Sequence, residues 1–148
     1  MARKIDGYTL IEILVTLSIM GVLLALAVPS YTDWQMERQL TSDTKKVLSF
    51  LQEERSIAFT TKQDIQFTIT GTTNICDDMG NCLDTENAFI ANPTNFSISS
   101  RGVFDTGYIR IQNDSLRQKY EPRYSCVVLT TTRARLGKYD GSGNCDAQ

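Results

Sequence analysis

The chain has 148 residues, of which 41% are hydrophobic, and this suits one packed domain with an appendage. Its 15 basic and 17 acidic side chains give a formal net charge of -2, which argues against a globally basic nucleic-acid binder but leaves room for a local basic strip. The chain has no histidine, so serine and cysteine nucleophiles would lack their usual base; we expect neither an enzyme nor a cofactor or metal.

The N-terminal segment is the most apolar part of the chain. Arg3 and Lys4 precede a run from Tyr8 to Val28 in which Glu12 is the single charge. At about 1.5 Å per residue, a helix over this run is about 30 Å long, enough to cross the hydrocarbon core of a bilayer. The basic leader places the N-terminus in the cytoplasm and the remaining chain outside.

Three other interpretations of this run compete. A cleaved secretory signal is disfavoured because the run is longer than a usual signal core and has no small-x-small site at its far end; Ala25 and Ala27 come nearest to one. A buried core helix is disfavoured because little chain follows to surround it. A plain membrane anchor agrees with the run but does not explain its acidic residue.

Glu12 needs such an explanation. A carboxylate in a membrane-spanning helix costs about 2.5–3.5 kcal/mol on insertion scales, so a partner or a function is expected. Cleavage between Gly7 and Tyr8 would create an α-amino cation in the apolar zone. The Glu12 carboxylate of a neighbouring subunit could neutralise this cation and set how the two subunits dock.

The motif Gly7–Glu12, with the sequence GYTLIE, resembles the class III signal of type IV prepilins and type II secretion pseudopilins. The resemblance implies cleavage after Gly7 by a prepilin peptidase, N-methylation of Tyr8 and a helix-registering role for Glu12. The family usually has phenylalanine where this chain has Tyr8. Gly21 and Pro29 fall where such helices loosen or kink.

The same resemblance implies a location and partners. The chain would be a single-pass protein of the bacterial inner membrane with its head in the periplasm, and later part of an extracellular pilus. Its partners would be other major and minor pilins, the prepilin peptidase, the inner-membrane assembly platform and the membrane itself before assembly.

Beyond Pro29 the pattern becomes amphipathic. Leu40, Val47, Leu48 and Leu51 recur at helical spacing, so one long helix is predicted from about Tyr8 to about Phe59. The expected organisation is a leader at 1–7, a transmembrane and filament-core helix at 8–29, an amphipathic helix at 30–60 and a β-rich globular head at 61–148.

The head shows the period of β-strands. Ile65, Phe67 and Ile69 alternate with polar residues, as in a half-buried strand. The polar stretch 71–86 is predicted to be a loop. Further strands are expected to begin at residues 96, 108, 126 and 133. The predicted fold class is therefore α+β, a type IV pilin fold in which the long helix packs on a small, largely hairpin-connected antiparallel sheet.

Four cysteines lie beyond the apolar run: Cys76, Cys82, Cys126 and Cys145. An even number outside the membrane suits disulfides, and three pairings are open. Neighbour pairing, Cys76 with Cys82 and Cys126 with Cys145, is favoured because each pair closes a short loop. A four-thiolate zinc site is the alternative, disfavoured because no C-x-x-C pair is present.

The order of the head segments 95–102, 107–111, 126–129 and 133–135 resembles the GspH/FimT group of minor pilins and H-type pseudopilins. This resemblance implies a minor type IV pilin that helps to prime pilus assembly. Two alternatives remain open: a pilus-borne DNA receptor for natural transformation, and the H-type pseudopilin of type II secretion.

Arg133 and Arg135 are the candidate DNA-binding residues. They alternate along a predicted strand, so both side chains emerge on one face, with Lys138 close by. Two guanidinium groups can grip successive phosphates. FimT-like pilins that take up DNA use a Gly-Arg-x-Arg motif, and Thr132 stands here in place of its glycine. The competing interpretation is that both arginines are solvated charges that discourage edge aggregation.

Overall fold

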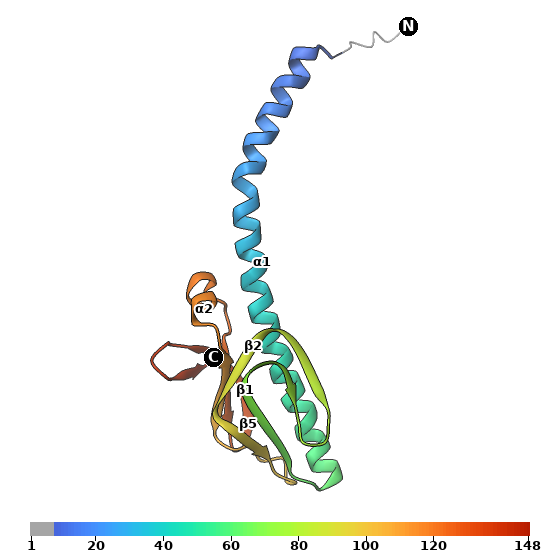
Figure 1. Ribbon diagram of the computed structural model, residues 1–148, viewed down its shortest axis with the longest axis vertical. Helices are drawn as coiled ribbons and strands as arrows, with labels where there is room; N and C mark the ends of the chain where they lie inside the picture. The colour runs from blue at the N-terminus through green and yellow to red at the C-terminus, as the bar shows by residue number, and fades with distance from the viewer. Residues whose placement is uncertain (1–7) are drawn as a thin grey trace. The chain divides into compact units, whose positions relative to one another are not determined.

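The computed structural model describes residues 8–148, apart from the side chains of residues 26, 27 and 29 (Figure 1). The chain divides into two compact units, Met1–Gln35 and Met36–Gln148, and each is described by itself. The elements are α1 (Leu10–Thr61), β1 (Ile65–Cys76), β2 (Cys82–Ile98), β3 (Gly107–Ile111), α2 (Asp114–Tyr120), β4 (Cys126–Thr130), β5 (Arg133–Tyr139) and β6 (Cys145–Ala147).

The described part of the first unit is dominated by the first half of α1. Thr9 precedes the helix, and its Oγ1 accepts from the backbone N–H of Glu12 at 3.3 Å, which caps the helix start. Helix α1 continues without interruption through Gly21 and Pro29. An 18-residue window of α1 has a mean hydropathy of 2.5, so the helix is long and apolar enough to cross a membrane.

In the second unit, the other half of α1 packs on the sheet through an apolar stripe. Leu40, Val47, Leu51 and Ala58 are fully buried at helical spacing. Their partners are alternate residues of the strands, since successive side chains of a strand point to opposite faces. The core residues of the sheet are Ile65, Phe67, Ile69, Phe89, Phe96, Ile98, Ile109, Ile111, Val127 and Leu129.

The sheet has six antiparallel strands in the order β1-β2-β3-β4-β5-β6, so every strand pairs with the next one along the chain. Figure 1 shows the sheet lying against the second half of α1. This arrangement confirms the predicted α+β class, with a long N-terminal helix and an antiparallel sheet, and it is a type IV pilin-like architecture.

Several boundaries differ from those predicted. Most of the segment 71–86 is strand rather than loop, since β1 continues to Cys76 and β2 starts at Cys82. Phe96 lies near the end of β2 instead of beginning a strand. Helix α2 and strand β6 were not predicted. Register shifts between Thr68 and Asn74 break the alternation in β1, which explains why its second half resembled a loop.

The loop after β1 folds back along the outer edge of that strand. Asp78 donates its backbone N–H to the Gln66 carbonyl at 3.0 Å, and its Oδ1 accepts from the Gln66 N–H at 2.9 Å. Phe67 and Asp77 form an isolated antiparallel bridge beside this pair. The backbone of β1 is therefore hydrogen-bonded at this point on the side that faces away from β2.

Candidate functional site

The first candidate site is the start of α1. Tyr8 is 81% exposed, and the apolar side chains that follow it are exposed as well. Glu12 lies in the first helical turn and is exposed, and no ion pair joins it to another described residue. A carboxylate in the first turn is favoured by the helix dipole. This segment therefore presents an apolar surface with one negative charge close to its N-terminal end.

The predicted cleavage site falls partly beyond what the structure covers. Gly7, together with Arg3 and Lys4, lies outside the described residues, whereas Tyr8 and Glu12 are described. Cleavage after Gly7, methylation of Tyr8 and the registering role of Glu12 remain predictions.

Both cysteine pairs form disulfides in the second unit. Cys76 is bonded to Cys82, with Cα atoms 4.1 Å apart, and this bond closes the β1–β2 loop. Cys126 is bonded to Cys145, with Cα atoms 6.3 Å apart, and links β4 to β6 across β5. These are the neighbour pairs favoured from the sequence. Among residues 8–148, no group of three or more metal-ligating side chains occurs.

The structure brings Arg133 and Arg135 to one face of β5. Both are exposed, whereas the alternate residues Ala134 and Leu136 pack toward the core. Neither arginine forms an ion pair with another described residue. Lys138 is exposed too, but it lies an odd number of residues away and pairs in register with Asp146 of β6. Strand alternation therefore places the Lys138 side chain on the opposite face of β5 from the two arginine side chains.

A second pair of arginines, not singled out from the sequence, lies near the other end of β5. The Tyr139 ring has Arg110 at 4.7 Å and Arg117 at 4.9 Å from its centroid. Asp114 Oδ1 accepts from both guanidinium groups, at 3.0 and 3.2 Å. Arg117 also donates to the Tyr139 carbonyl at 3.0 Å. These two arginines share one carboxylate partner and connect α2 to the sheet, unlike Arg133 and Arg135.

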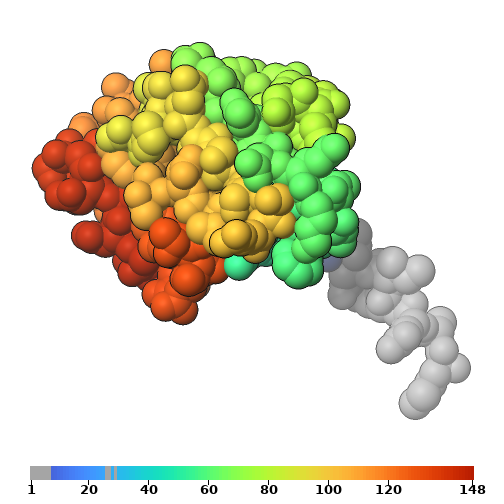
Figure 2. All heavy atoms as spheres, turned by 90° about the horizontal axis from the view of Figure 1, so that it is seen from below, coloured from blue at the N-terminus to red at the C-terminus, as the bar shows by residue number. Residues whose placement is uncertain are grey.

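Arg133 is the first residue of β5 and lies at one end of this unit. The turn after β2, the β4–β5 turn and α1 contact one another there. The Phe104 N–H donates to the Thr131 carbonyl at 3.3 Å, which joins the turn after β2 to the β4–β5 turn. The Arg55 guanidinium of α1 lies 5.4 Å from the centroid of the Phe104 ring. Figure 2 looks onto this end of the unit from below. Arg133, the first residue of β5, therefore follows a turn that is hydrogen-bonded to another segment of the head.

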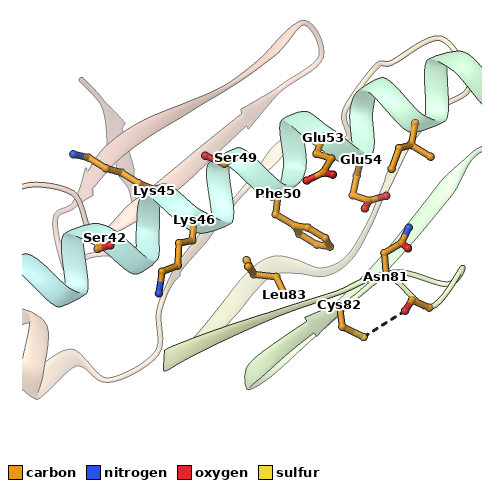
Figure 3. Close-up of a pocket in the computed structure, with 12 residues that line it drawn as sticks. Ser42, Lys45, Lys46, Ser49, Phe50, Glu53, Glu54, Asn81, Cys82 and Leu83 are labelled. Atoms are coloured by element: carbon orange, nitrogen blue, oxygen red, sulfur yellow. Dashed lines mark hydrogen bonds between the residues drawn. The ribbon is translucent and has the colours of Figure 1, made fainter.

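A cleft between α1 and the β1–β2 loop contains the third group of interest. Its volume is about 770 Å³, and Figure 3 shows Glu54 directed from α1 toward Asn81 of the loop. Glu54 is 1% exposed and Asp77, at the end of β1, is 8% exposed. Burial and the nearby Asp77 charge raise the pKa of Glu54 to about 7. Neither residue was singled out for this role from the sequence.

Comparison with known proteins bears on the N-terminal segment. Residues 2–28 match the family model of the prokaryotic N-terminal methylation motif. No curated protein and no solved structure matches the chain significantly. The matched segment includes Tyr8, Glu12 and most of the exposed apolar run. The chain thus carries the prokaryotic N-terminal methylation motif, which agrees with the class III signal expected at Gly7–Glu12.

Proposed function

We propose that this chain is a minor type IV pilin that helps to prime assembly of the filament. The observation that carries the proposal is the exposed apolar part of α1, whose single charge, Glu12, lies within the methylation motif. Such a segment needs lipid or other apolar helices around it. Before assembly it would span the inner membrane, with the head in the periplasm.

The proposed mechanism is electrostatic registration of packed helices. Prepilin peptidase cleaves after Gly7, and the new amino group on Tyr8 is methylated and remains cationic. In the filament, Glu12 of one subunit neutralises this amine on its neighbour. Because the dielectric constant among packed apolar helices is low, this pairing discriminates strongly against other registers.

Substitution of Glu12 tests this mechanism. We expect Glu12→Val to reach the membrane fraction but to be missing from sheared filaments, because it keeps the apolar segment and loses the registering charge. Thr16→Val is the matched control, since it also replaces a polar side chain of this segment by valine; it should enter filaments normally. Wild-type amounts of Glu12→Val in filaments would refute the mechanism.

Mass analysis of the mature polypeptide tests the processing step. We expect a chain that starts at Tyr8 and carries one added methyl group. An intact leader, or a start at any other residue, would contradict the proposal. The minor and priming role is tested by deletion of the gene, which should reduce filament number although the chain itself is sparse in filaments.

A second candidate function is that of a DNA receptor borne on the pilus. It is supported by the contrast between the two arginine pairs: Arg110 and Arg117 both form ion pairs with Asp114, whereas Arg133 and Arg135 are exposed and have no ion-pair partner among the described residues. Unpaired guanidinium groups at alternate positions of a strand suit phosphate contacts.

A salt titration of DNA binding tests this second function. The double variant Arg133→Ala/Arg135→Ala should bind DNA more weakly than the wild type. The magnitude of the slope of log affinity against log salt concentration should also fall by about 2, because each lost phosphate contact reduces this slope by about 0.9. Arg123→Ala, which removes another exposed arginine, is the control. Equal affinities of wild type and double variant would remove the DNA-receptor hypothesis.

A further inference from the structure

Two carboxyl groups from different elements interact where α1 packs against the β1–β2 loop. Glu54 comes from α1, and Asp77 follows β1 directly after the disulfide-bonded Cys76. Both side chains are more than nine-tenths buried. Two adjacent buried carboxylates repel each other and lose hydration, so a charge on both is unfavourable.

The hydrogen bonds of the two carboxyl groups differ. Asp77 Oδ1 accepts from the backbone N–H groups of Met79 and Asn81, at 3.0 and 2.7 Å, and Asp77 Oδ2 accepts from Asn81 Nδ2 at 3.0 Å. Both oxygens of Asp77 are therefore hydrogen-bond acceptors. Glu54 Oε2, in contrast, is buried without a hydrogen-bond partner. A proton on Glu54 would make it a donor to Asp77.

The charged groups around Glu54 do not neutralise it. On α1, Lys45, Lys46 and Glu53 line the same cleft, but Lys46 is paired with Asp43 at 3.0 Å and Glu53 adds negative charge. On the loop, Asp78 Oδ1 accepts from the Gln66 N–H. Among residues 8–148, no basic side chain forms an ion pair with Glu54.

We propose that Glu54 and Asp77 share one proton, and that this proton fastens the disulfide-closed loop to α1 and is lost when the surroundings become alkaline. When the proton leaves, two buried negative charges face each other and the loop separates from the helix. Asn81 and Leu83 on the hairpin side of the cleft then move away from Phe50 on α1, so this face of the head changes with pH (Figure 3).

The direction of the pH effect follows from the pKa of Glu54. It rises from 4.5 to about 7 in the folded protein, chiefly through burial and then through the Asp77 charge. The folded state therefore binds this proton more tightly than the unfolded chain does. The stabilisation is fully present below the unfolded pKa and is lost as pH rises through the folded pKa.

Hydrogen exchange of the full-length, disulfide-intact protein in detergent micelles tests the proposal. Protection factors of the Met79 and Asn81 amides, corrected for intrinsic exchange, should fall about ten-fold between about pH 6 and about pH 8 in the wild type. Glu54→Gln should remove this pH dependence, because its amide donates to Asp77 at every pH. Glu53→Gln, the matched control one residue earlier, should keep it.

Flat wild-type protection would overturn the proposal, as would a Glu54→Gln protein with the wild-type pH dependence. If Glu54→Gln fails to fold, infrared spectroscopy of the unmodified protein gives a second test. A protonated carboxyl band that titrates near neutral pH in the wild type and at lower pH in Asp77→Asn supports the shared proton. The absence of such a band in the wild type, or an unchanged titration in Asp77→Asn, refutes it.

Discussion

The two parts of α1 are both helical, but they differ in how their apolar side chains are packed. In the part that ends at Gln35, apolar side chains cover the helix and remain exposed. In the part that starts at Met36, apolar side chains form one stripe that the sheet buries. The apolar side chains of the second part thus have partners inside the chain, whereas those of the first part are exposed and suit lipid or other apolar helices.

Polar residues follow the same division. Asp43 is buried in the second unit, where its carboxylate accepts from the Asn87 backbone N–H at 3.2 Å and from Asn87 Nδ2 at 2.8 Å. Glu12, in the first unit, has no such internal partner among the described residues. The carboxylate of Asp43 is thus hydrogen-bonded within the second unit, whereas the carboxylate of Glu12 remains available to another molecule.

The largest expected effect that separates the two parts concerns apolar truncation. Leu51→Ala should lower the free energy of unfolding by about 4 kcal/mol, because it leaves a cavity between α1 and the sheet. Leu17→Ala removes the same atoms from the exposed part and should leave this value unchanged. Urea unfolding of both full-length variants in micelles measures the difference, and similar losses would show that the two parts are not energetically distinct.

Removal of a disulfide should act on the second unit alone. Cys126 and Cys145 are 19 residues apart, so their bond restricts the unfolded chain, and Cys126→Ser/Cys145→Ser should cost about 3 kcal/mol of unfolding free energy. Membrane insertion of the double variant should remain normal. Thermal unfolding and membrane fractionation check the two halves of this prediction; loss of insertion would contradict it.

A smaller effect is expected at the buried carboxylate of the second unit. Asp43→Ala should lower the unfolding free energy by about 2 kcal/mol, because the donors of Asn87 lose their charged acceptor. Ser42→Ala, at the neighbouring exposed position, should change it little. Chemical denaturation provides the comparison, and equal stability of the two variants would indicate that water replaces the carboxylate at no cost.

The sequence predicted the elements whose apolar pattern is regular. The amphipathic period around Leu40 and Leu51 indicated the second part of α1, and the alternation of Ile65 and Phe67 indicated β1. Periodicity failed where the strand is polar and bulged, as from Gly71 to Cys76. It also failed for α2, a seven-residue helix that Asn113 caps through a side-chain bond to the Leu116 N–H, because a helix this short has too few buried residues to show a period.

The candidate sites were predictable to different degrees. Contiguous motifs such as the one that contains Glu12 are visible in one sequence, and so is the alternation of Arg133 and Arg135. Glu54 and Asp77 are 23 positions apart, and only the packing of α1 on the hairpin brings them together. No local sequence pattern indicates that Glu54 and Asp77 lie close together in the fold. A buried acid at a stripe position of an amphipathic helix is the one signal that could have marked Glu54.

The fold-back of Asp77 and Asp78 along β1 has a consequence for aggregation. An uncovered outer strand offers free N–H and C=O groups to any extended peptide nearby, and such recruitment is hard to reverse. At Gln66 these groups are already engaged by the chain's own loop. At this position the outer edge of the sheet is thereby protected from joining another chain through intermolecular β-sheet.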